Sequence, residues 1–175
     1  MRKIFLVLTV LLAGCSSGKE EEINLAMVGK KAPEIKVSAL TERNGEWKIP
    51  GEKPQVVTFF STWQKDIGKI LTVIVDLESD FGGNAEFVLL SDEKPKDILK
   101  CLRARKISKV KAGSVKPAAF KNYRVYSRGE TVLISSGIVR GFIRIEDLTG
   151  KVVREFINGG EMPDAPFLKK DGISY

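Results

Sequence analysis

Hydrophobic residues follow two different spacings along the chain, and the spacing predicts which segments are strands. Apolar and polar residues alternate over Glu34–Val37, whereas Gln55–Phe60 is an almost unbroken apolar run rich in β-branched residues. Alternation is typical of a strand with one exposed face, and an unbroken run is typical of a strand covered on both faces. Asn44 and Gly45 lie between these two segments and favour a hairpin turn.

A three-and-four spacing of apolar residues predicts a helix over Lys65–Phe81, which ends at the Gly82-Gly83-Asn84 segment. A second buried strand is predicted over Glu86–Asp92. The segment KPKDILKCLRARKI that follows predicts a second helix, with Cys101 on its apolar side.

The C-terminal half is predicted to contain further strands. ETVLISSG is one strand, and Gly141–Asp147 is another, which turns at Thr149 and Gly150 into an antiparallel partner, KVVREFI. Between Ser108 and Tyr126 the sequence predicts only a helical turn, KPAAFKNY. This order of elements predicts an α/β fold with a mixed β-sheet flanked by helices on both faces.

The N-terminus has the features of an export signal. A basic MRK is followed by a run of nine mainly apolar residues, which is shorter than the ~20 residues that span a bilayer. The LAGC segment that ends at Cys15 resembles the bacterial lipobox, which implies cleavage before Cys15 and its acylation with fatty acids such as palmitate. Ser16 follows the cysteine in place of Asp, and by enterobacterial sorting this implies the periplasmic face of the outer membrane, if the organism is diderm.

These features divide the chain into four expected parts. We expect a lipoprotein signal peptide over residues 1–14, the lipidated cysteine and a polar tether over 15–27, a folded domain over 28–160 and a C-terminal tail over 161–175. Acyl chains on Cys15 would hold the domain at the membrane, because each buried methylene adds about 0.8 kcal/mol.

Composition excludes several kinds of chemistry. The chain has no histidine, which removes His-based triads and His metal ligands. Acidic residues are scattered, so no metal site and no cofactor are expected. With Cys15 lipidated, Cys101 would be the only free thiol, and a single thiol cannot form an internal disulfide.

Four short motifs in order resemble the thioredoxin-like fold, and in particular the membrane-anchored thiol-disulfide reductases of the TlpA kind and the redoxins. They are GKKAPEIKV, NGEWKI, VVTFFSTW and IRIEDLTGKVV, and together they cover roughly Val28–Gly159. The resemblance implies a thioredoxin-like domain with its active site directly after Trp63.

The residues that carry the family's chemistry are replaced in this chain. In the family a cysteine follows the Trp and a second cysteine lies three residues later, but here these positions hold Gln64 and Ile67. The family's cis-proline, counted back from Gly150, falls on Gly141. The resemblance therefore implies a degenerate, redox-inactive site that binds a partner or acts as a scaffold in the cell envelope.

An enzymatic alternative remains open through Cys101. Arg103, Arg105 and Lys106 lie close in sequence, and nearby cations favour a reactive thiolate, so a one-thiol peroxidase or oxidoreductase is conceivable. The apolar spacing of Ile98, Cys101 and Leu102 instead favours a buried, inert thiol.

Net charge and one aromatic residue, Trp63, suggest partners. The formal net charge is +7, and Lys94–Lys121 is the richest basic stretch. In an exported lipoprotein this favours an anionic envelope surface rather than nucleic acid, although solvated lysines remain the simpler explanation. Trp63 either contributes to binding of an envelope protein or peptide, or only packs against the scaffold.

Overall fold

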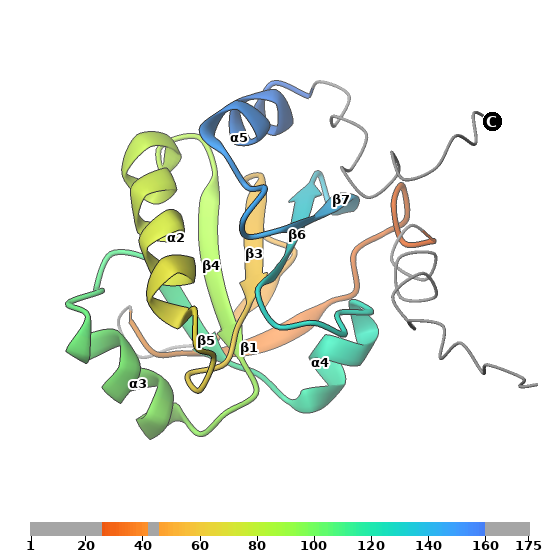
Figure 1. Cartoon of the computed structure of the whole chain (residues 1–175). Coiled ribbons are helices and arrows are strands. Elements are labelled where there is room, and N and C mark those ends of the chain that lie inside the picture. The colour runs from red at the N-terminus through yellow and green to blue at the C-terminus, as the bar shows by residue number, and fades with distance from the viewer. Residues whose placement is uncertain (1–25, 42–45, 160–175) are drawn as a thin grey trace, which may run out of the picture.

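The protein is described by a computed structural model, which covers residues 26–41 and 46–159. A single seven-stranded sheet with strand order β2-β1-β5-β4-β3-β6-β7 forms its centre (Figure 1). The strands are β1 (Ile35–Ala39), β2 (Glu46–Ile49), β3 (Gln55–Phe59), β4 (Glu86–Ser91), β5 (Lys111–Ser114), β6 (Glu130–Ser135) and β7 (Ile138–Arg144).

The sheet is mixed, as the sequence predicts. Strand β4 runs parallel to its neighbours β3 and β5 at the centre, and the pairs β1–β2, β1–β5, β3–β6 and β6–β7 are antiparallel. The expected turn at Asn44 and Gly45 lies outside the described residues, but β1 and β2 on either side of it pair with Ile35 opposite Ile49. Every residue of β3 is buried, as expected for a strand covered on both faces.

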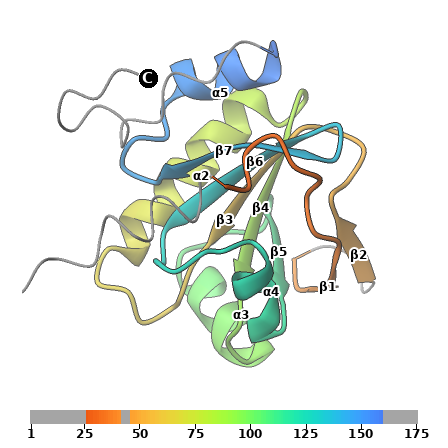
Figure 2. The ribbon, with the colours of Figure 1, turned by 90° about the vertical axis from the view of Figure 1, so that its right-hand side faces the viewer.

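Helices cover both faces of the sheet, which confirms the predicted architecture (Figures 1 and 2). They are α2 (Ile67–Phe81), α3 (Pro95–Ala104), α4 (Pro117–Asn122) and α5 (Gly150–Ile157). Buried side chains of α2, α3 and α5 belong to one apolar core, and those of α4 belong to the second core, on the opposite face.

The predicted strand KVVREFI is wrong, because this segment forms α5. The Thr149 hydroxyl accepts a hydrogen bond from the amide of Val152 at 3.4 Å, as a helix N-cap does. Val153 and Phe156 are three residues apart and both point into the core. Adjacent valines made the segment look like a strand, but their spacing to Phe156 suits one face of a helix.

The C-terminal hairpin exists, but it joins different strands from those predicted. Strands β6 and β7 are separated by only two residues, Ser136 and Gly137, which both have positive φ. Two positive φ values in a two-residue loop are the signature of a type I′ turn. Strand β6 therefore ends at Ser135, two residues before the predicted end at Gly137. Strand β7 begins at Ile138, three residues before the predicted start at Gly141.

Strand β5 was not predicted from the sequence. Its residues are Lys-Ala-Gly-Ser, a composition poor in the β-branched and aromatic residues that favour strands. It lies between β4 and β1, and an ideal Cβ on Gly113 would overlap the Val37 side chain of β1. The close approach of β1 therefore requires glycine at this position.

Met27, one residue before the expected domain boundary at Val28, is buried in the core that also includes side chains of α4. Among residues 26–41 and 46–159, none of the helices is both long and apolar enough to cross a bilayer. The expected signal peptide and most of the tether and tail lie outside the described residues.

Candidate functional site

Three loops meet at one edge of the sheet. Strands β3 and β4 run parallel, so the loops that follow them, 60–66 and 92–94, emerge at the same edge. Strand β6 runs antiparallel to β3, so the loop before it, 123–129, lies there too, and the amide of Gly129 donates to the carbonyl of Phe59 at 2.7 Å. We call these three loops the loop edge. Ligands of open α/β sheets commonly bind outside the carboxyl ends of parallel strands.

Gln64 and Ile67, the two positions where the resemblance places cysteines, are both tied into the structure. The Gln64 side-chain carbonyl accepts a hydrogen bond from the amide of Ser61 at 2.8 Å, which closes a turn. Ile67 begins α2 and is 4% exposed in the core. An amide that holds a turn and a buried alkyl chain cannot exchange electrons with a disulfide.

Glu93 holds the first of these loops in place, a role that was not predicted from the sequence. Its carboxylate accepts hydrogen bonds from the Thr62 amide at 2.6 Å, from the Thr62 hydroxyl at 2.9 Å and from the Ser91 hydroxyl at 3.1 Å. The backbone carbonyl of Glu93 accepts a further bond from the hydroxyl of Ser114 at 3.1 Å. An acid two residues beyond a buried strand is too common a pattern to reveal this role.

Gly129, and not Gly141, lies opposite Gln64. Gly141 lies within β7 and pairs with Leu133, two strands away from β3. An ideal Cβ on Gly129 would instead lie 3.7 Å from the Gln64 side-chain nitrogen. The expected position of Gly141 was therefore wrong, because it was counted back from Gly150 on the assumption that a hairpin turn, and not a helix, began there.

Arg128 ties the loop before β6 to the end of β4. Its guanidinium donates to the carboxylate of Asp92 at 3.0 Å and stacks 3.9 Å from the centre of the Phe120 ring. Together with the contacts of Glu93, this pair connects all three loops of the loop edge, so their relative positions are held by charged hydrogen bonds.

Trp63 and Tyr126 are exposed on the loop edge. Trp63 is 70% exposed and Tyr126 is 51% exposed, and Val28 is the third large hydrophobic side chain exposed among the described residues. Trp63 follows β3 and Tyr126 precedes β6, so both belong to loops at the same edge. Exposed aromatic side chains on a fixed backbone are suited to contact another polypeptide.

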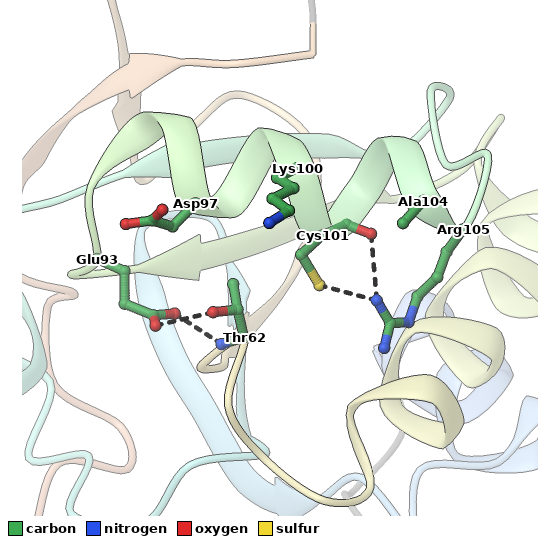
Figure 3. Close-up of a pocket in the computed structure, with 7 residues that line it drawn as sticks. All are labelled: Thr62, Glu93, Asp97, Lys100, Cys101, Ala104 and Arg105. Carbon is green, nitrogen blue, oxygen red and sulfur yellow. Dashed lines mark hydrogen bonds between the residues drawn. The ribbon is translucent and has the colours of Figure 1, made fainter.

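Cys101 lines an open pocket of about 390 Å³ beside the loop edge (Figure 3). Glu93 and Thr62 line the same pocket, so the thiol lies near the loop after β3 although it is far from it in sequence. Cys101 itself is only 8% exposed and points inward with Ile98 and Leu102, as the apolar spacing predicts.

Two electrostatic effects shift the pKa of the Cys101 thiol in opposite directions. Burial raises the pKa of the thiol above its ordinary value, and the Arg105 guanidinium counteracts this shift, with its nitrogen 3.3 Å from the sulfur. Arg103 and Lys106, the other two expected cations, are exposed, and Arg105 is the cation that acts on the thiol. The net effect is a raised pKa of the Cys101 thiol, which disfavours the thiolate.

No group of three or more potential metal ligands occurs within the described ranges 26–41 and 46–159. Cys15, the expected site of lipidation, lies outside the described residues. The described part of the chain therefore offers the loop edge and the Cys101 pocket as its candidate sites.

Comparison with known proteins identifies the fold but no close relative. No protein-family model matches the chain, and no curated protein matches it either. Among solved structures, the thioredoxin domain of a thiol-disulfide oxidoreductase from Bacteroides vulgatus is similar with a TM-score of 0.66 and 17% identity, over 75% of this chain and 98% of that one.

Two further structures give the same result. A thiol:disulfide interchange protein from Bacteroides sp. has a TM-score of 0.64 and 18% identity, over 75% of this chain and 91% of that chain. The thiol:disulfide interchange protein DsbE from Chlorobium tepidum has a TM-score of 0.62 and 16% identity, over 75% and 96%. The chain therefore has a thioredoxin-like fold, as the motifs of the sequence indicate.

Proposed function

We propose that this thioredoxin-like chain is a membrane-anchored bacterial lipoprotein whose domain binds a polypeptide partner in the cell envelope and does not exchange disulfides. The observation that carries the proposal is the state of the two positions after Trp63. Gln64 closes a turn and Ile67 packs in the core, so the fold is kept while the sulfur chemistry is absent.

Disulfide exchange requires a thiolate that attacks and a second sulfur that resolves the mixed disulfide. Cys101 is the only cysteine among the described residues, its pKa is raised, and it faces the core. A lone protonated thiol has no resolving partner. Dithiol turnover is therefore not expected of this domain.

Binding is supported by the loop edge itself. Glu93 and Arg128 hold the three loops in fixed positions, and Trp63 and Tyr126 expose aromatic surface on them. A surface that is ordered before binding loses little conformational entropy when a partner docks. We place the partner, an envelope protein or peptide, at this edge.

The anchor is the second part of the proposal. The LAGC segment before Cys15 supports acylation, and the polar residues that follow it would link lipid and domain. By the same resemblance the location is the cell envelope, on the periplasmic face of the outer membrane in a diderm organism. Replacing Cys15 with Ser should abolish incorporation of labelled palmitate and release the chain from the membrane fraction.

The binding function is tested by capture from native membranes with the full chain, followed by titration of the captured partner in purified form. Trp63→Ala should weaken binding of that purified partner at least tenfold, since buried Trp side chains dominate binding energies. Val28→Ala, an exposed apolar residue away from the loop edge, is the matched control. Equal affinities of both variants would contradict the assignment of this surface.

One observation favours a second function, a one-thiol peroxidase. Cys101 lines an open pocket, and Arg105 contacts its sulfur. In that reaction the thiolate attacks a peroxide oxygen, the O–O bond breaks, water leaves after protonation, and an external thiol reduces the resulting sulfenic acid. Peroxide turnover that depends on an added thiol and is lost in Cys101→Ser would favour this function over the binding module.

A further inference from the structure

The positive charge of the protein is concentrated in one segment. Between Lys94 and Lys121 the chain has ten lysines and arginines and a single acid, Asp97, which gives this segment an excess of nine positive charges. The whole chain has a net charge of +7, so the remaining residues together are slightly negative. The basic character is therefore a local property of the α3–β5–α4 region.

Helix α3 arranges three of these charges as a stripe. Lys96, Lys100 and Arg103 are spaced by four and three residues, so they lie within about 60° of one another around the helix at 100° per residue. The buried residues Ile98 and Leu102, with Cys101, lie on the opposite side. All three basic residues are exposed, and we call them the α3 stripe.

The α3 stripe forms no ion pair within the described residues, although Asp97 lies on the same helix. None of its three side chains has a carboxylate within 4.0 Å among the described residues, whereas Lys111 of the same segment pairs with Glu86 at 2.9 Å. Acidic residues gather instead near the C-terminal end of α2, with Asp76, Glu78 and Asp80. That end of α2 lies at the far end of the molecule from α3 (Figure 1).

We propose that the α3 stripe docks the domain on a bilayer that contains anionic phospholipid. Basic residues near an anionic membrane surface each strengthen binding roughly fivefold, and three together reach about a hundredfold. Nucleic acid fits this surface less well, because no aromatic side chain on α3 could stack on bases. Docking through the α3 stripe would set the orientation of the domain on its membrane.

The inference draws support from the proposed anchor at Cys15. Ten residues lie between Cys15 and Ala26, where the described chain begins, and the eleven Cα–Cα steps from Cys15 to Ala26 span at most roughly 38 Å. A domain of this size is roughly 36 Å across. An anchor of that length lets any face of the domain reach the bilayer, so the distribution of charge decides which face does.

The test measures the exposure of individual lysines on the full chain. The chain is reconstituted into vesicles of phosphatidylcholine alone or mixed with phosphatidylglycerol, pulsed with an amine-reactive reagent, and analysed by peptide mass spectrometry. We expect Lys96 and Lys100 to be labelled several-fold more slowly on the anionic vesicles. Lys36 and Lys69, which are exposed elsewhere, should be labelled equally on both, and salt of roughly 0.5 M should remove the difference.

Charge-reversal variants provide the matched control. Lys96→Glu/Lys100→Glu/Arg103→Glu should abolish the slower labelling of Lys106, which is exposed just beyond the C-terminal end of α3. Reversal of the exposed residues Lys36, Lys69 and Arg140 changes the net charge equally and should leave the slower labelling of Lys106 in place. If both triple variants behave alike, only total charge matters and the proposal fails.

The remaining outcomes separate this proposal from the proposed function. Equal labelling of Lys96 on both kinds of vesicle would overturn the docking of α3 and leave the anchor and the Trp63-dependent binding untouched. Protection by soluble heparin but not by anionic vesicles would identify a soluble polyanion and overturn the bilayer as partner. A chain that floats only with anionic vesicles would lack the anchor but would still support the α3 stripe.

Discussion

Single side chains decide whether this thioredoxin-like domain can perform redox chemistry. Gln64 uses its amide to close a turn, Ile67 fills the core, and Cys101 is a buried thiol that contacts Arg105. Gln64 and Ile67 have no sulfur, and burial raises the pKa of the Cys101 thiol. Chemistry at this scale depends on the neighbours of a side chain as much as on its type.

Arg105→Gln should make the Cys101 thiol still less acidic. The guanidinium is the group that opposes the effect of burial on the thiol pKa, and glutamine removes its charge while keeping much of its bulk. The midpoint of the pH–rate profile for alkylation by iodoacetamide should therefore move to higher pH, with slower labelling at pH 8. Lys106→Gln is the control, because it also removes one positive charge close in sequence but Lys106 does not affect the pKa of the thiol. It should leave the profile unchanged. A shift to lower pH would contradict the assigned role of Arg105.

Tyr123→Phe should destabilise the domain by about 1 kcal/mol in chemical denaturation. The Tyr123 hydroxyl donates to the carbonyl of Pro33 at 2.6 Å, and the ring is fully buried beside Phe59. Loss of the hydroxyl leaves the Pro33 carbonyl without this donor.

The same variant has a second signature at alkaline pH. Burial raises the pKa of Tyr123, so the unfolded chain releases the phenolic proton first, near the ordinary pKa of about 10. The folded protein therefore loses stability as pH rises through and above that value. Tyr123→Phe should lose less stability than the parent between pH 8 and pH 11, and equal losses would contradict this assignment.

At the level of elements, tertiary contacts overrode local preference in two segments. Strand β5 has almost no strand-forming residues, but it lies between β4 and β1, where only a small side chain fits against Val37. Helix α5 has adjacent valines that favour a strand, but Val153 and Phe156 bury one face against α2. Secondary structure in both cases follows from which face the neighbours cover.

Gly113→Ala should destabilise the domain by roughly 1–3 kcal/mol. A methyl group at this position overlaps the Val37 side chain and comes within 3.2 Å of the Ser38 carbonyl oxygen, so β1 and β5 must separate. Gly68→Ala is the matched control, because nothing lies within 4 Å of its ideal Cβ in the first turn of α2. Helix propensity predicts that the control gains about 0.5–1 kcal/mol. Thermal and urea unfolding of both variants provide the measurement.

At the scale of the whole molecule, the sheet brings together three loops that are distant in sequence. Glu93 and Arg128 connect the loops after β3 and β4 with the loop before β6, and the same packing places Cys101 in a pocket beside Thr62. The loop edge therefore unites residues from three segments that lie far apart in the sequence.

Restoring two cysteines should restore a dithiol. Gln64→Cys/Ile67→Cys places one thiol at the first residue of α2 and the other three residues before it, and amides at a helix N-terminus stabilise a thiolate. We expect the double variant to form an internal disulfide and to accelerate the reduction of insulin by dithiothreitol, which the parent should not do. Gln64→Cys alone is the control. Failure of the oxidised double variant to lose two free thiols would show that the loop geometry has also diverged.

The amino-acid sequence by itself determined the α/β class and the positions of most strands and of α2 and α3, since these depend on local apolar spacing. It also determined the absence of a dithiol after Trp63, since this depends only on which residues are present. The burial of Cys101 also followed from its spacing to Ile98 and Leu102. Tertiary structure alone decided that KVVREFI is a helix and that Gly129, not Gly141, faces Gln64. It also decided that Glu93 holds Thr62 and that Cys101 lies near the loop after β3, because contacts between distant residues depend on strand register and on packing between elements.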